Sequence, residues 1–337
     1  MKVTLCTLFE GHYHHGVAAL ANSLVASGYA GTLWVGHRGP LPAWMREHPG
    51  FDGDSVLQAT PALALRTIAL DPPVSLNYCK ASLIEEVLQR REPDADACAY
   101  VDPDIVVTCS WPEMAAWFAS DGLALVEDAD GVLPSAALRR QQWAGFFSPY
   151  GQVPVRTLER YYNSGFVGVQ RAQLPFVRTW QRTCDLVAEA CGRVKQQRKA
   201  GEPGSLFHST DEDALNFALM SSDVPIDAQG PEAMGFAPNG RHLSHAVGAL
   251  KPWQGRHLRR ILLRGESPDD ANRWFYRFAA GPLAPFSPRL LLWRRLSLAL
   301  ACLPGRIAGM LRRSPTRTTT SAAFSVALRS AVAPRIR

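Results

Sequence analysis

Two carboxylates stand one residue apart where an apolar stretch of the chain ends, in Tyr100-Val101-Asp102-Pro103-Asp104. In extended backbone, residues i and i+2 face the same way, and Pro103 favours the extended form at Asp102. Two convergent carboxylates can bind a hard divalent cation, which completes its shell with water and substrate phosphates. A D-x-D pair is also common in ordinary surface turns, but its place after an apolar strand favours a metal site.

A second set of reactive side chains lies between His245 and Trp253, where an imidazole, Gly248, Lys251 and a rigid Pro-Trp turn follow one another. A lone histidine is more often structural than a metal ligand. An imidazole added to carboxylates, however, shifts the preference from Mg²⁺ towards Mn²⁺, and a nearby lysine can reach a diphosphate held by the same metal. The residues by themselves thus offer a carboxylate pair that could bind a divalent cation, and an imidazole that would favour Mn²⁺ if it joined them.

Alternating strand and helix patterns surround these residues. Helical spacing of apolar residues is found over residues 17–28, ending at Gly28 as a C-cap, and over residues 77–90. Strand patterns are found over residues 3–9, 32–36, 98–107, 123–126 and 162–169. This alternation predicts an α/β fold: a Rossmann-like, mostly parallel sheet flanked by helices, with ligands bound at the carboxyl ends of its strands.

The composition is that of a soluble globular protein, with 47% hydrophobic and 20% charged residues. The first residues, MKVTLCTLFE, hold too short an apolar run for a signal peptide or a membrane span, so we expect a cytoplasmic protein. The seven cysteines form no C-x-x-C pair, which favours reduced thiols and gives no indication of zinc.

The formal net charge of +6 comes from the C-terminal region, because residues 271–337 contain twelve arginines, no lysine and no acidic residue. We expect no nucleic-acid partner, since the charge describes a tail and not a folded face with aromatic stacking motifs. Residues 289–303 are apolar with arginines and a tryptophan, too short to span a bilayer. This segment is expected to lie peripherally on an anionic membrane, and a helix packed on the catalytic domain is nearly as good an interpretation.

These motifs resemble those of the family 8 glycosyltransferases, which include glycogenin and bacterial lipopolysaccharide and lipooligosaccharide glucosyl- and galactosyltransferases. The pattern H-x-x-G-x-x-K-P-W is matched at every specified position from His245 to Trp253. Further matches follow in the family's order over roughly residues 1–255: Tyr78-Cys79-Lys80, Tyr100-Val101-Asp102-Pro103-Asp104, Tyr162-Asn163-Ser164-Gly165-Phe166 and Asp211-Glu212-Asp213-Ala214-Leu215-Asn216.

The resemblance implies a GT-A fold, a UDP-sugar donor, Mn²⁺, and transfer of a hexose with retention of anomeric configuration. By position in the family's motifs, Asp102, Asp104 and His245 would be the ligands of Mn²⁺ or another divalent cation. Gly248 and Lys251 would contact the diphosphate, with Lys251 stabilising the leaving group. Substrate contacts are further implied for Tyr13, Lys80, Asn163 and Asp211.

Two segments depart from the family's pattern. Glu212 stands where the family often has glutamine or another neutral residue, which places an extra carboxylate near the reacting carbon. With Asp211 it is a candidate catalytic residue, either as a nucleophile or, as we favour, by binding sugar hydroxyls; a front-side route to retention is the alternative. In the first loop, Glu10-Gly11-His12-Tyr13-His14-His15 replaces an acidic segment, and Tyr13 is expected to stack on the nucleobase. A metal site formed by the three histidines is less favoured, because carboxylate or cysteine partners are missing.

We therefore predict a glycosyltransferase domain over residues 1–255 and a basic, partly helical, membrane-associating extension over residues 256–337. The expected acceptor is a glycan or glycolipid in cell-surface polysaccharide or lipopolysaccharide synthesis, at the inner face of the cytoplasmic membrane. A catalytically inactive fold-mate and a nucleotidyltransferase of sugar-nucleotide synthesis are the alternatives. The first would be expected to lack Asp104, His245 or Lys251, and the second to carry a glycine-rich N-terminal loop with Arg and Lys; this sequence shows neither feature.

Overall fold

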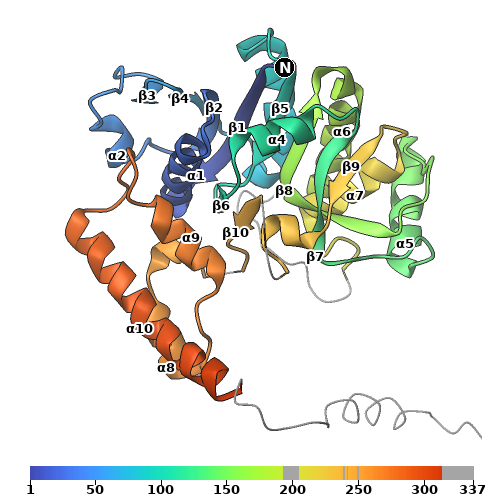
Figure 1. Cartoon of the computed structure of the whole chain (residues 1–337). Coiled ribbons are helices and arrows are strands. Elements are labelled where there is room, and N and C mark those ends of the chain that lie inside the picture. The colour runs from blue at the N-terminus through green and yellow to red at the C-terminus, as the bar shows by residue number, and fades with distance from the viewer. Residues whose placement is uncertain (193–204, 238–239, 241, 249, 313–337) are drawn as a thin grey trace, which may run out of the picture.

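The apolar runs of the sequence form the strands of an eight-stranded sheet, with a separate two-stranded sheet beside it (Figure 1). The computed structural model describes residues 1–192, 205–237, 240, 242–248 and 250–312. The strands are β1 Val3–Glu10, β2 Gly31–Arg38, β3 Val56–Thr60, β4 Leu63–Ala69, β5 Ala97–Val101, β6 Ile105–Val107, β7 Leu123–Val132, β8 Arg160–Gln170, β9 Ile226–Gln229 and β10 Leu243–His245.

Helices cover both faces of the large sheet and form the C-terminal region (Figure 1). The α-helices are α1 His14–Ser27, α2 Ala43–Arg46, α3 Lys80–Glu86, α4 Trp111–Phe118, α5 Leu138–Phe147, α6 Leu174–Ala190, α7 Thr210–Met220, α8 His257–Arg264, α9 Asp270–Phe278 and α10 Pro288–Arg312. Shorter helical turns are η1 Gly11–Tyr13, η2 Leu76–Cys79, η3 Val87–Arg91, η4 Ser148–Tyr150, η5 Arg171–Gln173, η6 Pro231–Met234 and η7 Pro252–Gln254.

The strand order of the large sheet is β3-β4-β2-β1-β5-β8-β7-β9. The pairs β4–β2, β2–β1, β1–β5 and β7–β9 are parallel, whereas β8 runs antiparallel to both of its neighbours and β3 antiparallel to β4. The predicted α/β fold with a mainly parallel sheet flanked by helices is therefore confirmed. The reversed direction of β8 has a direct consequence for the site, because its first half lies at the carboxyl edge of β5.

Strand β1 is buried along seven of its eight residues, as a central parallel strand covered on both faces must be. Its alternate side chains enter two different cores. Cys6 and Leu8 pack with α3 and α6, and Leu5 and Phe9 pack with α1. Helix α1 ends at Gly28, whose φ of +88° supplies the expected left-handed C-cap.

Two local predictions needed correction. The helix expected over residues 77–90 begins as the 3₁₀ turn η2 and ends in the π turn η3, so only residues 80–86 are α-helical. The strand expected over residues 98–107 is divided into β5 and β6 by a turn at Asp102, closed by the hydrogen bond from Ile105 N to Asp102 O (3.0 Å). Strands β3 and β4 were not predicted.

The C-terminal helices pack on the α/β unit through one buried side chain of α1. The Asn22 amide nitrogen donates to the carbonyls of Phe278 (2.7 Å) and Leu283 (2.8 Å), and its oxygen accepts from Leu283 N (3.0 Å). Trp253, Phe275 and Phe286 share a third core with α10. The helical character expected after residue 255 is confirmed for α8, α9 and α10, while residues 313–337, with the biased segment 316–323, lie outside the described residues.

No helix in the described part of the chain combines the length and the apolar character needed to cross a bilayer.

Candidate active site at the carboxyl edge of the sheet

The turn between β5 and β6 places Asp102 and Asp104 at the carboxyl edge of the sheet. Asp102 N donates to Gly165 O (2.7 Å), which fixes the turn against β8. Beyond the turn, β6 pairs antiparallel with β10, so His245 lies opposite Ile105. Ala246 N then donates to Asp104 O (2.9 Å), and this pairing brings together residues that are distant in sequence.

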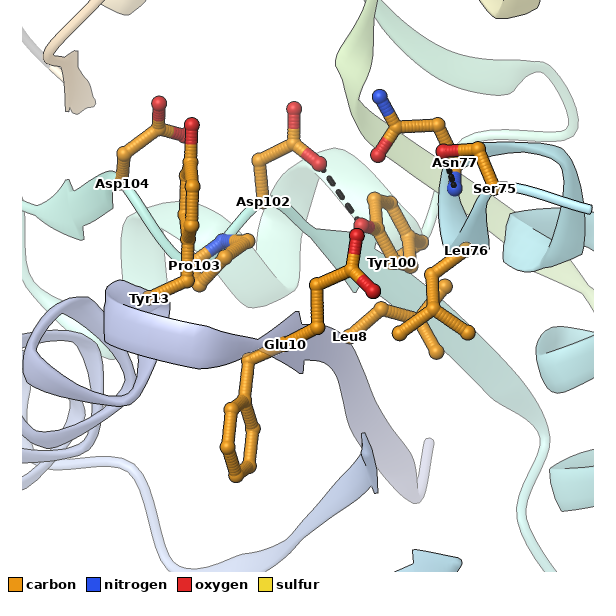
Figure 2. A pocket seen from close by; sticks show the side chains of 11 residues that line it. Leu8, Glu10, Tyr13, Ser75, Leu76, Asn77, Tyr100, Asp102, Pro103 and Asp104 are labelled. Atoms are coloured by element: carbon orange, nitrogen blue, oxygen red, sulfur yellow. Dashed lines mark hydrogen bonds between the residues drawn. The ribbon is translucent and has the colours of Figure 1, made fainter. Parts of the chain in front are cut away.

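The predicted metal ligands converge. One ligand atom from each of Asp102, Asp104 and His245 lies within 4.8 Å of the other two, and His245 Nε2 is 3.3 Å from Asp104 Oδ1. Figure 2 shows the two carboxylates side by side and pointing the same way. Residues 102–104 form a turn and not the extended backbone expected from the sequence, so the turn is what brings the two carboxylates together. His245 Nδ1 is buried and has no hydrogen-bond partner.

Gly165 leaves the space that this cluster needs. A Cβ at this position would lie 2.8 Å from Asn163 Oδ1, 2.9 Å from His245 Cε1 and 3.0 Å from Asp102 Oδ2. A side chain here would therefore fill the cradle between the ligands. Two carboxylates and one imidazole around such a cradle form a donor set that suits Mn²⁺.

Two lysines neutralise much of the negative charge. Lys251 is 4% exposed; its ammonium contacts Asp104 Oδ2 and donates to Ala246 O (2.7 Å). Lys80, the first residue of α3, is 1% exposed and lies 3.2 Å from Asp102 Oδ1 and 2.9 Å from Asp211 Oδ2. The predicted cationic residues thus both reach the site, one from each side of the carboxylate pair.

The charge state of Lys80 follows from its surroundings. Burial by itself lowers the pKa of this ammonium, but the charges of Asp102 and Asp211 outweigh burial and raise its pKa above the usual 10.5. Lys80 also donates to Ser164 O and Ser164 Oγ, both at 3.1 Å. It is therefore a permanent cation that connects β8 and α7 to the metal ligands.

Strand β8 and helix α7 supply a second group of polar residues. Asn163 Nδ2 donates to Glu212 Oε1 and Asp128 Oδ1, each at 3.0 Å, while Asn163 Oδ1 accepts from Gly165 N (2.9 Å). Burial and the charges of Asp128 and Asp211 raise the pKa of Glu212 well above its usual value, although Lys80 opposes the shift. Glu212 is therefore inclined to keep a proton.

Helix α7 is fixed against β8 by two fully buried side chains, those of Asp213 and Asn216. Asp213 accepts from the Tyr161 hydroxyl (2.7 Å), and Asn216 exchanges hydrogen bonds with the backbone of Tyr162 (2.9 and 2.8 Å). Asp211 accepts from Ser164 Oγ (2.9 Å). In the D-x-D-x-x-N segment, Asp213 and Asn216 therefore have structural roles, while Asp211 and Glu212 face the site.

A cavity of about 150 Å³ opens beside the two aspartates (Figure 2). Leu8, Phe9 and Glu10 from the end of β1 form its wall with Tyr13, Ser75-Leu76-Asn77 and Tyr100. Tyr13 packs edge-on against Trp253, with ring centroids 5.1 Å apart, and the Lys251 ammonium is 6.0 Å from the Tyr13 ring. Tyr13 is therefore positioned between the cavity and the lysine.

Gly248 lies in the loop that joins β10 to Lys251. Its φ of +91° is in the left-handed region, which only glycine adopts readily, and its backbone is open on the side that a Cβ would occupy. The loop can therefore present backbone groups to a ligand.

The three histidines of the first loop lie close enough to share an ion, but their hydrogen bonds restrict them. Trp44 Nε1 donates to His14 Nδ1 (3.0 Å), which assigns the proton of neutral His14 to Nε2, away from a metal-binding form. The His14 and His15 rings are stacked with centroids 4.0 Å apart. Burial and the charges of His15 and His12 lower the pKa of His14 to about 4. These contacts indicate a packing role.

Four polar groups of the site were not predicted from the sequence: Ser164, Asp128, Asn77 and the Tyr100 hydroxyl. The Tyr100 hydroxyl donates to Asp102 Oδ1 (2.7 Å), so it orients a predicted metal ligand. Signals for three of them were present, because Ser164 is part of the Y-N-S-G-F segment, Tyr100 opens the Y-V-D-P-D segment and Asp128 follows the apolar start of β7.

The chain matches no protein-family model and no curated protein sequence. Among solved structures it resembles WbbM, a bifunctional glycosyltransferase in its apo form, with a TM-score of 0.51 and 13% identity over 87% of this chain. The chain covers 51% of WbbM, about half its length. LgtC, a galactosyltransferase in complex with donor and acceptor sugar analogues, gives a TM-score of 0.49 at 16% identity, covering 86% of this chain and 99% of LgtC.

At these identities the likeness concerns the fold. The strand order, the D-x-D turn at the carboxyl edge of the sheet and the WbbM comparison agree with one another. The chain therefore has the GT-A fold of glycosyltransferases, as its resemblance to family 8 implied.

Proposed function

We propose that this protein is a glycosyltransferase that moves a hexose from a UDP-sugar to a glycan or glycolipid acceptor, with retention of anomeric configuration. One observation carries the proposal: Asp102, Asp104, His245 and Lys251 converge beside a cavity at the carboxyl edge of a GT-A sheet. The glycosyltransferase activity of WbbM, which shares the fold, supports the reaction class.

The residues fit a divalent cation, for which we favour Mn²⁺. Asp102, Asp104, Asp128 and Asp211 contribute four negative charges, and Lys80 and Lys251 contribute two positive charges. The cluster thus has two net negative charges, which a divalent cation would neutralise, so that the site would no longer repel a diphosphate. When bound, the cation would act as a Lewis acid that stabilises charge on the leaving phosphate.

Lys251 supplies the second cation at the leaving group. Its ammonium is buried between Asp104 and the ring of Tyr13, where water screens charge poorly. Gly248, three residues earlier, offers backbone groups to the same diphosphate. Tyr13, which lines the cavity, would stack on the nucleobase, as the exposed face of an aromatic ring allows.

Asn163, Asp211 and Lys80 would hold the donor sugar. The surroundings of Glu212 favour its protonated form, which can donate a hydrogen bond to a hydroxyl of the sugar. A protonated carboxyl is also a poor nucleophile. This arrangement supports front-side retention, in which the departing phosphate helps to deprotonate the acceptor. A nucleophilic Glu212 is the competing route.

The acceptor is proposed to be membrane-linked, in cell-surface polysaccharide or lipopolysaccharide synthesis at the inner face of the cytoplasmic membrane. The support is helix α10, which exposes Leu292, Trp293 and Leu300 beside arginines and without one acidic residue. Such a face suits peripheral attachment to anionic lipid.

A donor screen tests the reaction class. Purified protein with Mn²⁺ is given each UDP-sugar in turn with a panel of acceptors, and UDP release is measured. We expect the wild type to release UDP with one UDP-hexose. This release should be lost when the divalent cation is chelated and in the Asp104→Asn variant. Sugar-nucleotide binding without any release would instead favour an inactive fold-mate, and nucleotide triphosphate consumption would favour a nucleotidyltransferase.

A further inference from the structure

A small pocket lies against helix α8, outside the cavity beside the two aspartates. It has a volume of about 190 Å³ and is lined by Leu250, Arg256, Arg259, Arg260 and Leu263. The four residues contributed by α8 and its N-cap are spaced i, i+3, i+4 and i+7, so they share one face of the helix. The pocket is thus bordered by three guanidinium groups on a single stripe.

The positive charge in this pocket is only partly balanced. Arg260 pairs with Glu266 (2.7 Å), whereas the side chains of Arg256 and Arg259 form no hydrogen bond or ion pair with any described residue. The first turn of α8 contains no acidic residue. Cations near a helix N-terminus face the positive end of the helix dipole, which destabilises them there. An anion in the pocket would remove this repulsion.

Exposed apolar side chains lie on the same helix as the arginines and on the helix packed against it, and one of them, Leu263, lines the pocket. Leu262 and Leu263 are 81% and 70% exposed, and α10, which contacts α8, exposes Trp293 at 60%. Figure 1 shows α8 and α10 together at the end of the molecule away from the large sheet. A free anion would gain nothing from exposed leucine and tryptophan. A lipid presents both an anionic headgroup and an apolar boundary, so it matches both parts of this surface.

We propose that the α8 pocket binds the phosphate group of an anionic lipid. Arg256 and Arg259 donate to the phosphate oxygens, since the guanidinium fork matches phosphate geometry. Leu263, beside the arginines, and Trp293 of α10 enter the boundary between headgroups and acyl chains. The proposal rests on the membrane contact of the proposed function and is independent of glycosyl transfer. The pocket adds one specific headgroup site to a membrane contact that otherwise depends on the general attraction between arginines and anionic lipid.

Sedimentation of the full chain with phosphatidylcholine vesicles, with and without phosphatidic acid, tests the site. The variant is Arg256→Gln/Arg259→Gln, and the matched control is Arg46→Gln/Arg289→Gln, which removes the same charge from exposed positions outside the pocket. We expect the pocket variant to bind phosphatidic acid vesicles at least about 30-fold more weakly, because each arginine loses a charged hydrogen bond. The control should lose at most about fivefold.

Soluble phosphate provides the second arm. At equal ionic strength, inorganic phosphate should release the wild type from the vesicles more effectively than chloride, and this difference should vanish in the pocket variant. Equal weakening of both double variants would overturn the site in favour of diffuse charge. Phosphate binding by a wild type that ignores phosphatidic acid would overturn the lipid assignment. Unchanged circular dichroism shows that both variants fold, and UDP release from a soluble acceptor reaction reports the proposed function separately.

Discussion

The ammonium of Lys80 lies 2.9 Å from the carboxylate of Asp211, which joins the start of α3 to the start of α7 beneath the site. The same nitrogen is 3.2 Å from Asp102, so one buried cation holds a proposed metal ligand and a proposed donor-sugar residue at once. Since α3 and α7 contact different parts of the sheet, the position of Asp211 relative to the metal site depends on this lysine.

Substitution of Lys80 by Met should therefore destabilise the protein strongly. It leaves Asp102 and Asp211 without their shared cation, and removal of one partner from a buried ion pair costs about 3–5 kcal/mol. Urea denaturation measures the free energy of unfolding. Lys2→Met is the control, because Lys2 is exposed and its ion pairs with Glu92 and Asp94 are worth about 1 kcal/mol or less. A loss of the same size in both variants would contradict the joining role of Lys80.

UDP binding should require a divalent cation and all three predicted ligands. Asp102→Asn, Asp104→Asn and His245→Gln should each weaken cation-dependent UDP binding by tenfold or more, by analogy with the loss of about 10–100-fold at perturbed metal sites. Isothermal calorimetry with and without EDTA measures the effect. Undiminished UDP affinity in EDTA would rule out the assignment of these residues as metal ligands.

Lys251→Met should lower turnover more than donor affinity. Charge on the leaving diphosphate grows towards the transition state, so a cation buried beside it acts more strongly there than in the ground state. We expect kcat to fall by about 100-fold or more, with a smaller change in the Kd for UDP-sugar. Equal losses in kcat and in affinity would mean that Lys251 binds both states alike.

Glu212→Gln should stabilise the protein at neutral pH. The raised pKa of Glu212 means that the folded protein holds a proton that the unfolded chain releases above about pH 4.5, so wild-type stability falls as the pH rises from that value towards the folded pKa. Glutamine does not ionise, so it removes this loss of stability, and its side-chain oxygen can still accept the hydrogen bond from Asn163. Thermal unfolding across this pH range should show a gain of about 1 kcal/mol or more that grows with pH.

The exposed Glu47→Gln is the control for this stability change and should alter it by less than about 0.5 kcal/mol. Activity of Glu212→Gln separates the two routes to retention. Substantial turnover is expected if Glu212 only binds a sugar hydroxyl. Abolished turnover with intact UDP binding would identify Glu212 as the nucleophile.

The sequence alone predicted those helices and strands in which the apolar residues follow one clear pattern, either that of a helix or that of a strand. The apolar run of β1 and the helical spacing that ends at Gly28 correspond to real elements because burial on one or two faces requires those patterns. It also singled out Asp102, Asp104 and His245, which the folded chain brings within 4.8 Å of one another, although their role as metal ligands stays a prediction. The π turn η3, which follows α3, has no comparable sequence pattern. It differs from an α-helix in its backbone hydrogen bonds and not in its types of side chain.

Only the tertiary structure decided which polar residues meet. The direction of β8, antiparallel to β5, places Asn163 and Gly165 at the metal site, and the pairing of β10 with β6 places His245 beside Asp104. Neither the direction of β8 nor the pairing of β10 with β6 follows from the residue types, since side chains alternate between the two faces of a strand in the same way whichever way it runs. The pairing of Lys80 with Asp211 and the raised pKa of Glu212 likewise arise from burial and from charges distant in sequence, which exist only once the chain has folded.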